Sequence, residues 1–188
     1  MTDGLRDLRE RYNGAVALSY EAQRVRTGQW KEEERLLALY LDEYEPDTVL
    51  DVPCGTGRFF GLYEERGIEA DGIDMSHDML ELARERGWGG VRTGDIFAID
   101  AGDDEYDMAV CFRLLNWMTE DECVAALTEL GRVADLVVVS ITVGYGNNGR
   151  TVAQPPTVFR DAGLAELTGA DIIVRPEWTY RVAVLGAE

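Results

Sequence analysis

Apolar residues recur along the chain at spacings that alternate between helical and extended. Residues 15–44 read as a helical region, in which Leu37, Leu41 and Tyr44 lie four and three positions apart. A run of five charged residues, 31–35, precedes them, and we interpret it as a solvent-facing side of the helix. The region therefore predicts amphipathic helices ahead of the first strand.

Short apolar runs bounded by turn residues predict the strands. We expect strands at 48–50, 68–73, 90–93, 106–112 and 135–141, with helices at 58–66, 79–86 and from 119 onward. Gly67 is placed to end the first of these helices, and Ser76 to cap the second. Thr119 and Glu122 form a capping box for the third. Because strands that alternate with helices form βαβ units, the order predicts a parallel sheet with helices on both faces.

The end of the chain follows a different pattern. A loop rich in Gly, Asn and Pro at 142–156 precedes a short helix at 157–162, and strands follow at 171–175 and 180–185. So few residues join these two strands that they must pair antiparallel, as a hairpin at the edge of the sheet. The predicted fold is α/β: a doubly wound, Rossmann-like, mostly parallel seven-stranded sheet with one antiparallel edge strand.

Composition supports a single globular unit and makes some partners less favourable. The chain has 188 residues, of which 46% are hydrophobic, and 36 acidic against 18 basic residues give a net charge of −18. This charge disfavours nucleic-acid binding, which needs Lys and Arg to displace counterions from phosphates. Lys31 is the only lysine, which fits either a salt-adapted source or a genome that favours arginine codons.

The cysteines and the apolar runs bear on where the protein works. Cys54, Cys111 and Cys123 form neither a CxxC pair nor a zinc ribbon, so we interpret them as reduced thiols. No apolar run approaches the roughly 18 residues of a membrane span, and the charged start of the chain lacks the apolar core of a signal peptide. We therefore expect a cytoplasmic protein without a membrane segment.

Polar residues gather where the first three predicted strands end, which is where doubly wound sheets bind ligands. Residues 51–57 read Asp-Val-Pro-Cys-Gly-Thr-Gly, and the glycines let the backbone approach a ligand beside free N–H groups of a helix start. The second strand runs into Asp74, whose carboxylate can take both hydroxyls of a ribose. Asp95 follows the third, where it can accept an adenine amino group while Ile96 and Phe97 cover the ring.

Two other nucleotide-binding loops do not fit this sequence. A dinucleotide-binding dehydrogenase also has a glycine loop with an acid about 20 residues later. Its spacing, counted from Gly55 and Gly57, puts a third glycine at position 60, which is Phe60. A phosphate-binding Walker loop is excluded because no Gly-Lys-Ser/Thr occurs. A further alternative is that the glycines make only a tight turn and the acids only cap helices.

The loop resembles the first motif of class I S-adenosylmethionine-dependent methyltransferases, Asp/Glu-x-Gly-x-Gly-x-Gly. Asp51, Gly55 and Gly57 match, and Pro53 replaces the first glycine. The likeness extends from about Val49 to the C-terminus. It implies that the matched residues hold the amino-acid end of the cofactor S-adenosylmethionine, which is released as S-adenosylhomocysteine.

The same resemblance implies roles for other residues. Asp74 would bind the ribose, and Asp95 with Ile96 the adenine. The full set expected at the cofactor is Asp51, Pro53, Gly55, Gly57, Asp74, Met75, Asp95, Ile96 and Phe112, with no metal.

The loop after the fourth strand is where this family places residues that face the methyl group. Arg113 could hold a substrate carboxylate or phosphate, and Asn116 could orient an amine or hydroxyl. Trp117 is either a wall of the pocket or a core aromatic. His77, the only histidine, is expected at a helix start or cofactor edge rather than in catalysis. The predicted substrate lid consists of Tyr20, Trp30, Trp117 and Tyr145.

The resemblance implies an enzyme that transfers a methyl group to a small molecule. We expect residues 1–45 to form helices that cap the substrate and residues 46–188 to form the S-adenosylmethionine-binding domain, within one compact unit. A pocket with short inserts suits a small-molecule partner better than a macromolecule. A non-catalytic binding or scaffold domain, or a methyltransferase for protein or RNA, is the alternative.

Overall fold

The computed structural model describes residues 14, 16, 17, 19, 28–144, 155–175 and 178–187. Helices alternate with strands through most of this range, as the apolar spacing predicts. The elements are α3 (Gly28–Tyr44), β1 (Thr48–Asp51), α4 (Phe60–Arg66), β2 (Glu69–Asp74), α5 (His77–Glu85), β3 (Val91–Thr93), β4 (Tyr106–Cys111), η1 (Leu115–Trp117), α6 (Glu120–Val133), β5 (Ala134–Gly144), α7 (Pro155–Asp161), β6 (Leu164–Arg175) and β7 (Trp178–Ala187).

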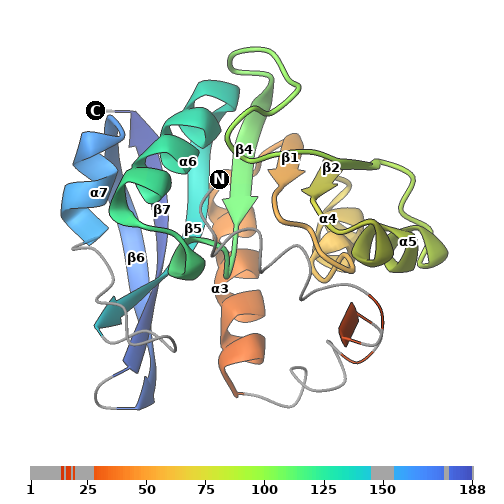
Figure 1. Ribbon diagram of the computed structural model, residues 1–188, viewed down its shortest axis with the longest axis horizontal. Helices are drawn as coiled ribbons and strands as arrows, with labels where there is room; N and C mark the ends of the chain where they lie inside the picture. The colour runs from red at the N-terminus through yellow and green to blue at the C-terminus, as the bar shows by residue number, and fades with distance from the viewer. Residues whose placement is uncertain are drawn as a thin grey trace.

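The strands form one seven-stranded sheet in the order β3-β2-β1-β4-β5-β7-β6 (Figure 1). β1 pairs parallel with β2 and β4, whereas β7 pairs antiparallel with both β5 and β6. The predicted fold class is confirmed, and the reversed strand lies one place in from the edge strand β6. The C-terminal hairpin is confirmed too, but its first strand begins at Leu164, ahead of the expected 171, and a register shift between Glu166 and Thr168 breaks the apolar alternation there.

Two layers of helices cover the sheet, α6 and α7 on one face and α3, α4 and α5 on the other (Figure 1). Side chains of β5 alternate between the two cores: Val137 and Val139 pack on the α6 side, and Val138 packs on the α3 side. All three are fully buried. The continuous apolar run of this strand is thus explained by burial on both faces.

The predicted helix ends are found where the sequence places them. Gly67 adopts the left-handed conformation with φ 69° and closes α4. The Ser76 hydroxyl accepts a hydrogen bond of 3.2 Å from the Met79 backbone N–H at the start of α5. Thr119 and Glu122 make both halves of the capping box that opens α6.

One residue of helix α3 departs from the predicted amphipathic pattern. Glu33 is 0% exposed, so the interpretation of the charged run as a solvent-facing side is wrong at this residue. Leu37 and Leu41, four and eight positions further on, are buried in the core between α3 and the sheet. The start of the predicted helical region, 15–27, lies mostly outside the described residues.

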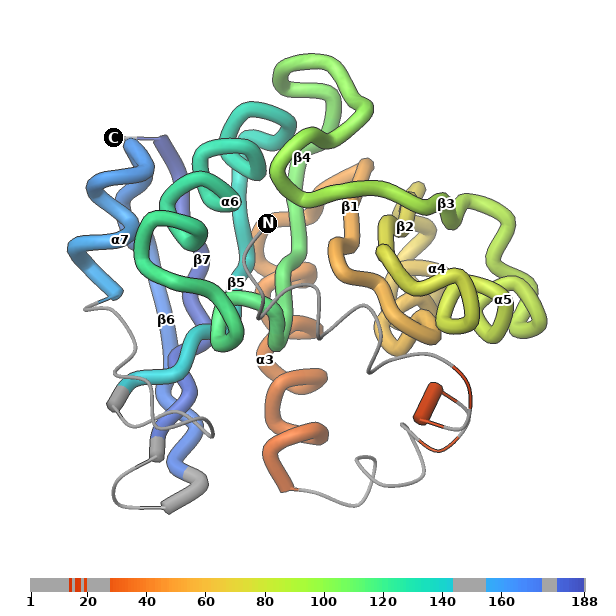
Figure 2. Tube along the Cα trace, in the orientation of Figure 1, coloured from red at the N-terminus to blue at the C-terminus, as the bar shows by residue number. Residues whose placement is uncertain are grey.

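The parallel strands end at the same edge of the sheet. The connection from β3 to β4 crosses β2 and β1 on the α6 side of the sheet (Figure 2). Because β1, β2, β3 and β4 are parallel neighbours, the loops that follow them lie together at that edge. None of the helices in the described part of the chain is long and apolar enough to cross a bilayer.

Candidate functional site

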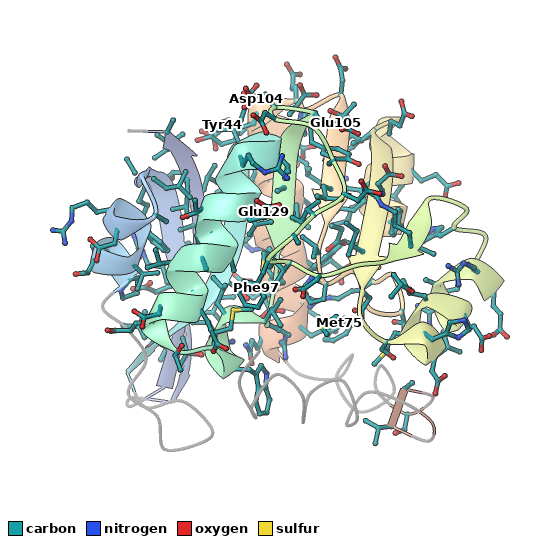
Figure 3. All side chains as sticks on the ribbon, turned by 45° about the horizontal axis from the view of Figure 1, so that its top comes forward. Tyr44, Met75, Phe97, Asp104, Glu105 and Glu129 are labelled. Atoms are coloured by element: carbon teal, nitrogen blue, oxygen red, sulfur yellow. The ribbon has the colours of Figure 1, made fainter. Side chains whose placement is uncertain are left out.

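A cavity lies where the parallel strands end. Its wall comes from the loops after β1, β2, β3 and β4, together with Trp30 near the start of α3. Figure 3 shows Met75 and Phe97, two of its lining residues, near the same edge of the sheet, whereas Tyr44, Asp104 and Glu105 lie toward the opposite edge. The position is the one that doubly wound sheets use for ligands.

The glycine loop forms one wall of the cavity at Gly55. This residue has φ 56°, a left-handed conformation that favours glycine, and a Cβ placed there would meet no atom within 4 Å. Its backbone N–H donates a hydrogen bond of 2.9 Å to Oδ2 of Asp74. The loop thus presents open backbone to the cavity and holds the carboxylate that follows β2.

Asp74 is a fixed carboxylate on the cavity wall. Its Oδ1 accepts a hydrogen bond of 2.8 Å from the Ser76 N–H, so backbone amides hold both oxygens. Burial raises the pKa of this carboxyl, and the amides that donate to it act in the opposite direction. A carboxylate has about four acceptor sites, so a group fixed in this way still has acceptor capacity toward ribose hydroxyls.

Asp95 lies on the wall one strand further along. Its Oδ1 accepts a hydrogen bond of 3.1 Å from the Phe97 N–H, which orients the carboxylate at the end of β3. Ile96 is buried and Phe97 partly buried beside it. A carboxylate flanked by apolar side chains suits the amino edge and the faces of an adenine ring. Pro53, Met75, Ile96 and Phe112 also line the cavity, as the resemblance implies.

Two residues of the matched motif do not line the cavity. Asp51 is 1% exposed and accepts a hydrogen bond of 3.3 Å from the Tyr63 hydroxyl, and burial raises its pKa to about 8. Gly57 has φ 83°, and a Cβ there would lie 1.7 Å from Cζ3 of Trp88. The structure therefore places both residues behind the loop, where they support its shape, and not on the wall that would contact a cofactor's amino-acid end.

A buried ionic cluster forms another part of the site. Oε2 of Glu33 in α3 lies 2.7 Å from Nη1 of Arg58, next to the glycine loop, and 2.8 Å from Nε of Arg113, which follows β4. Gln29 donates a hydrogen bond of 3.1 Å to the other oxygen of Glu33. We call Glu33, Arg58 and Arg113 the arginine cluster. It joins three separate segments of the chain at one end of the cavity.

Trp30 completes this end of the cavity. The guanidinium carbon of Arg58 lies 3.7 Å from the centroid of the Trp30 ring, and that of Arg113 lies 5.5 Å from it. Arg58 also donates a hydrogen bond to the Trp30 carbonyl. Cation–π stacking and ion pairing therefore hold the start of α3 against the loops.

Arg113 occupies an unusual backbone conformation. Its φ is 64°, in the left-handed region that costs a non-glycine residue about 1–2 kcal/mol. Its N–H donates a hydrogen bond of 2.9 Å to Oγ of Ser140 in β5, which helps to hold it there. Strain of this kind is typical of residues positioned for a function. Arg113 lines the cavity, as expected, with its Nε bound to Glu33.

Asn116 does not face the cavity. Its Oδ1 accepts hydrogen bonds of 2.7 Å from both the N–H and the hydroxyl of Thr142. Asn116 thus ties η1 to β5, and its expected role in orienting a substrate stays a prediction. Trp117 lines the cavity and also packs against the core.

Of the other residues considered from the sequence, the structure describes only His77. Tyr20 and Tyr145 of the predicted lid lie outside the described residues. His77 is exposed at the start of α5, with Nδ1 3.5 Å from a Glu81 oxygen. It takes the helix-start position that was expected for it.

Sequence reasoning missed Glu33 and Arg58. A signal for Glu33 was present, because Glu33, Leu37 and Leu41 share one helical face, and that face is the apolar one. Arg58 carries no comparable signal, since only the folded chain shows its pairing with a residue 25 positions away.

An open sheet with one reversed strand next to its edge, and with a glycine loop and acidic residues at successive strand ends, defines a class I S-adenosylmethionine-dependent methyltransferase fold. By sequence, residues 49–135 match the family described as "Methyltransferase domain". The resemblance found in the motif is therefore confirmed: residues 49–135 match a methyltransferase family, and the fold around them is like that of solved methyltransferases.

Two curated relatives share part of this sequence. The malonyl-[acyl-carrier protein] O-methyltransferase of Serratia marcescens is 33% identical over 101 residues, which cover 53% of this chain and 38% of the relative. The 18S rRNA (guanine-N(7))-methyltransferase bud23 of Schizosaccharomyces pombe is 27% identical over 183 residues, covering 88% of this chain and 65% of that one. The chain thus spans less than two thirds of either relative.

A solved structure covers the whole fold. Magnesium protoporphyrin IX methyltransferase from Synechocystis PCC 6803, crystallised with bound SAM, superposes with a TM-score of 0.79 at 15% identity, covering 100% of this chain and 99% of that one. At this identity the likeness shows the fold alone.

Proposed function

We propose that the protein is an S-adenosylmethionine-dependent methyltransferase that acts on a small molecule. The observation that carries the proposal is the arrangement of Asp74, fixed by the amides of Gly55 and Ser76, with Asp95 at the next strand end. When bound, the cofactor supplies a methyl group on a sulfonium that is already activated. The protein then has to supply mainly alignment and the exclusion of water.

Different residues of the cavity would bind the cofactor and exclude water. Asp74 would bind the ribose hydroxyls, and Asp95 the adenine amino group, with Ile96 beside the ring. The open backbone at Gly55 fits close approach of the cofactor, since no side chain occupies that space. Trp30, together with Phe112 and Trp117, would keep water from the reacting groups.

The small-molecule assignment rests on the chain's charge and on its relatives. With a net charge of −18, the protein would repel a phosphate backbone unless a local basic patch compensated. The names of the malonyl-[acyl-carrier protein] O-methyltransferase and of the magnesium protoporphyrin IX methyltransferase are consistent with the same assignment. We also propose that the segment 1–45 caps the substrate, and that the three free, buried cysteines reflect a cytoplasmic location.

RNA methylation is the second candidate function. It is favoured by the relative that is named as an rRNA methyltransferase and aligns with 88% of the chain. A binding domain without catalysis is the third, because Pro53 replaces a motif glycine. Transfer of a labelled methyl group to small-molecule pools, to RNA or to neither separates the three.

Calorimetric titration with S-adenosylmethionine and S-adenosylhomocysteine tests the cofactor site. We expect micromolar binding of both, weakened at least about tenfold in Asp74→Ala and Asp95→Ala, because each loses a charge-assisted hydrogen bond. Asp100→Ala is the matched control, since this acid is exposed on the same connection between β3 and β4. Equal binding by Asp74→Ala and the wild type would contradict the site.

A further inference from the structure

The glycine loop needs support from other parts of the chain. Gly55 and Gly57 have positive φ angles of 56° and 83°, and neither has a side chain that could pack against a neighbour. Glycine visits many backbone conformations, so contacts with other residues must select the one seen here. The Gly55 amide is held by Asp74. The Gly57 amide donates only within the loop, in a hydrogen bond of 2.9 Å to the Cys54 carbonyl, so support at this point has to come from another segment.

Trp88, in the connection between α5 and β3, supplies a contact at Gly57. A Cβ built on Gly57 would lie 1.7 Å from Cζ3 and 2.0 Å from Cε3 of Trp88. The six-membered ring of the indole therefore lies directly against the glycine backbone. Trp88 is partly buried against the core between α3 and the sheet, and it is not among the described residues that line the cavity. The contact is thus made behind the loop, away from the ligand.

Trp88 is itself held in place. Its ring packs against that of Phe60, the first residue of α4, with the ring centroids 3.3 Å apart. Its backbone N–H donates a hydrogen bond of 3.3 Å to the Ala83 carbonyl in α5. A tryptophan side chain has only two rotatable bonds, so an indole held by its backbone and by its ring is a rigid surface.

The segment that contains α5 therefore holds the loop at two points. Asp74 precedes the helix and binds the Gly55 amide, whereas Trp88 follows the helix and lies against Gly57. We propose that Trp88 is a positioning residue for the cofactor, which keeps the glycine loop in its binding conformation without touching the ligand. The proposal rests on the proposed methyltransferase function. Affinity falls in proportion to the fraction of molecules whose loop has that conformation, so a loosened loop binds more weakly.

Calorimetric titration with S-adenosylhomocysteine tests the effect on affinity. Trp88→Ala should bind at least about tenfold more weakly than the wild type, and Trp88→Phe, which keeps a ring, should stay within about threefold. Tyr44→Ala is the matched control: this aromatic residue is also partly buried against the same core. Figure 3 shows it toward the edge of the sheet opposite the cavity, so its loss should leave the affinity within about threefold of wild type.

Amide hydrogen exchange, followed by NMR without ligand, locates the effect in the loop. In Trp88→Ala the Gly55 amide should exchange at least about tenfold faster than in the wild type, because the loop opens more often. The Gly67 amide donates a hydrogen bond of 3.1 Å to the Glu64 carbonyl at the other end of α4, and its rate should not change. A general loss of stability would accelerate exchange at both amides.

Two results would overturn the proposal. One is wild-type affinity and a wild-type Gly55 exchange rate in Trp88→Ala, and the other is an equal loss of affinity in Tyr44→Ala. Trp88→Leu keeps an apolar side chain, so it gives the same comparison if Trp88→Ala does not fold. If the wild type itself fails to bind S-adenosylhomocysteine, the proposed function fails, and the exchange rates still decide whether Trp88 holds the loop.

Discussion

The two ends of the cavity are built in different ways. At the cofactor end, Asp74 and Asp95 bind backbone amides two residues further along the chain. At the other end, Glu33 binds arginines that lie 25 and 80 positions away. Apart from the Gly55–Asp74 hydrogen bond, which spans 19 positions, the first end is thus made of local turns at strand ends. The second exists only when α3 has packed on the finished sheet.

This difference predicts how each end responds to substitution. Changes at the cofactor end should alter binding while the fold survives, because each loop is held by many neighbours. Changes in the arginine cluster should alter the free energy of unfolding, because a buried charge left without its partner is costly. The predictions below test that division.

The largest loss of stability is expected for Glu33→Ala. Removing this carboxylate leaves two buried guanidinium groups without their counter-charge, and we expect the free energy of unfolding to fall by about 3–5 kcal/mol. Chemical denaturation measures it. Glu32→Ala is the matched control, because Glu32 and Arg35 form an exposed pair whose loss should cost less than about 1 kcal/mol. Similar losses in the two variants would show that the cluster does not anchor α3.

Gly57→Ala should have the next largest effect. The new methyl would meet the Trp88 ring in a left-handed conformation, so we expect a loss of about 2–3 kcal/mol, measured by thermal and chemical denaturation. Gly61→Ala is the control: Gly61 lies in α4 with open space around it, and alanine there should stabilise the protein by about 0.5–1 kcal/mol. A neutral Gly57→Ala would mean that this glycine serves the ligand and not the packing.

Asp51 should make the stability depend on pH. Burial raises its pKa to about 8, so between about pH 4 and 8 the folded chain keeps a proton that the unfolded chain releases. Through this one group, the free energy of unfolding falls as the pH rises, by up to about 1.4 kcal/mol per pH unit, and levels off above about 8. Chemical denaturation should show that the free energy of unfolding of the wild type falls over that window, whereas that of Asp51→Asn does not. The variant is therefore expected to become the more stable of the two as the pH rises. A difference in the free energy of unfolding that stays constant with pH would contradict a buried, protonated carboxyl at Asp51.

Gly55→Ala should have the smallest effect on stability. Only the left-handed backbone opposes alanine there, at a cost of about 1 kcal/mol, because the space around it is open. Its affinity for S-adenosylhomocysteine should fall at least tenfold if that space belongs to the cofactor. Unchanged affinity in a calorimetric titration would place the cofactor elsewhere.

The sequence predicts most of the fold because the fold follows local rules. The apolar run in β5, the capping box at Thr119 and the glycine after α4 each act over a few residues, and each is found in the structure. The order of β6 and β7 in the sheet also follows from the short link between them. The extent of β6 does not, because bulges interrupt its pattern.

The site is predictable to a lesser degree. Asp74 and Asp95 could be placed at the cavity because each follows a strand directly. The contact of Asn116 with Thr142 could not be foreseen, since Thr142 lies on β5, 26 positions further along the chain. Glu33 could not be predicted as buried, because a charged side chain is expected to face solvent. Its burial is stable only through ion pairs with arginines from two other segments of the chain.

One measurement tests the division of the cavity most directly: the crystal structure of the complex with S-adenosylhomocysteine. The account predicts the ribose hydroxyls on Asp74, the adenine amino group on Asp95, and the Glu33–Arg113 ion pair intact beyond the sulfur. A nucleoside stacked on Trp30 with its hydroxyls away from Asp74 would contradict it.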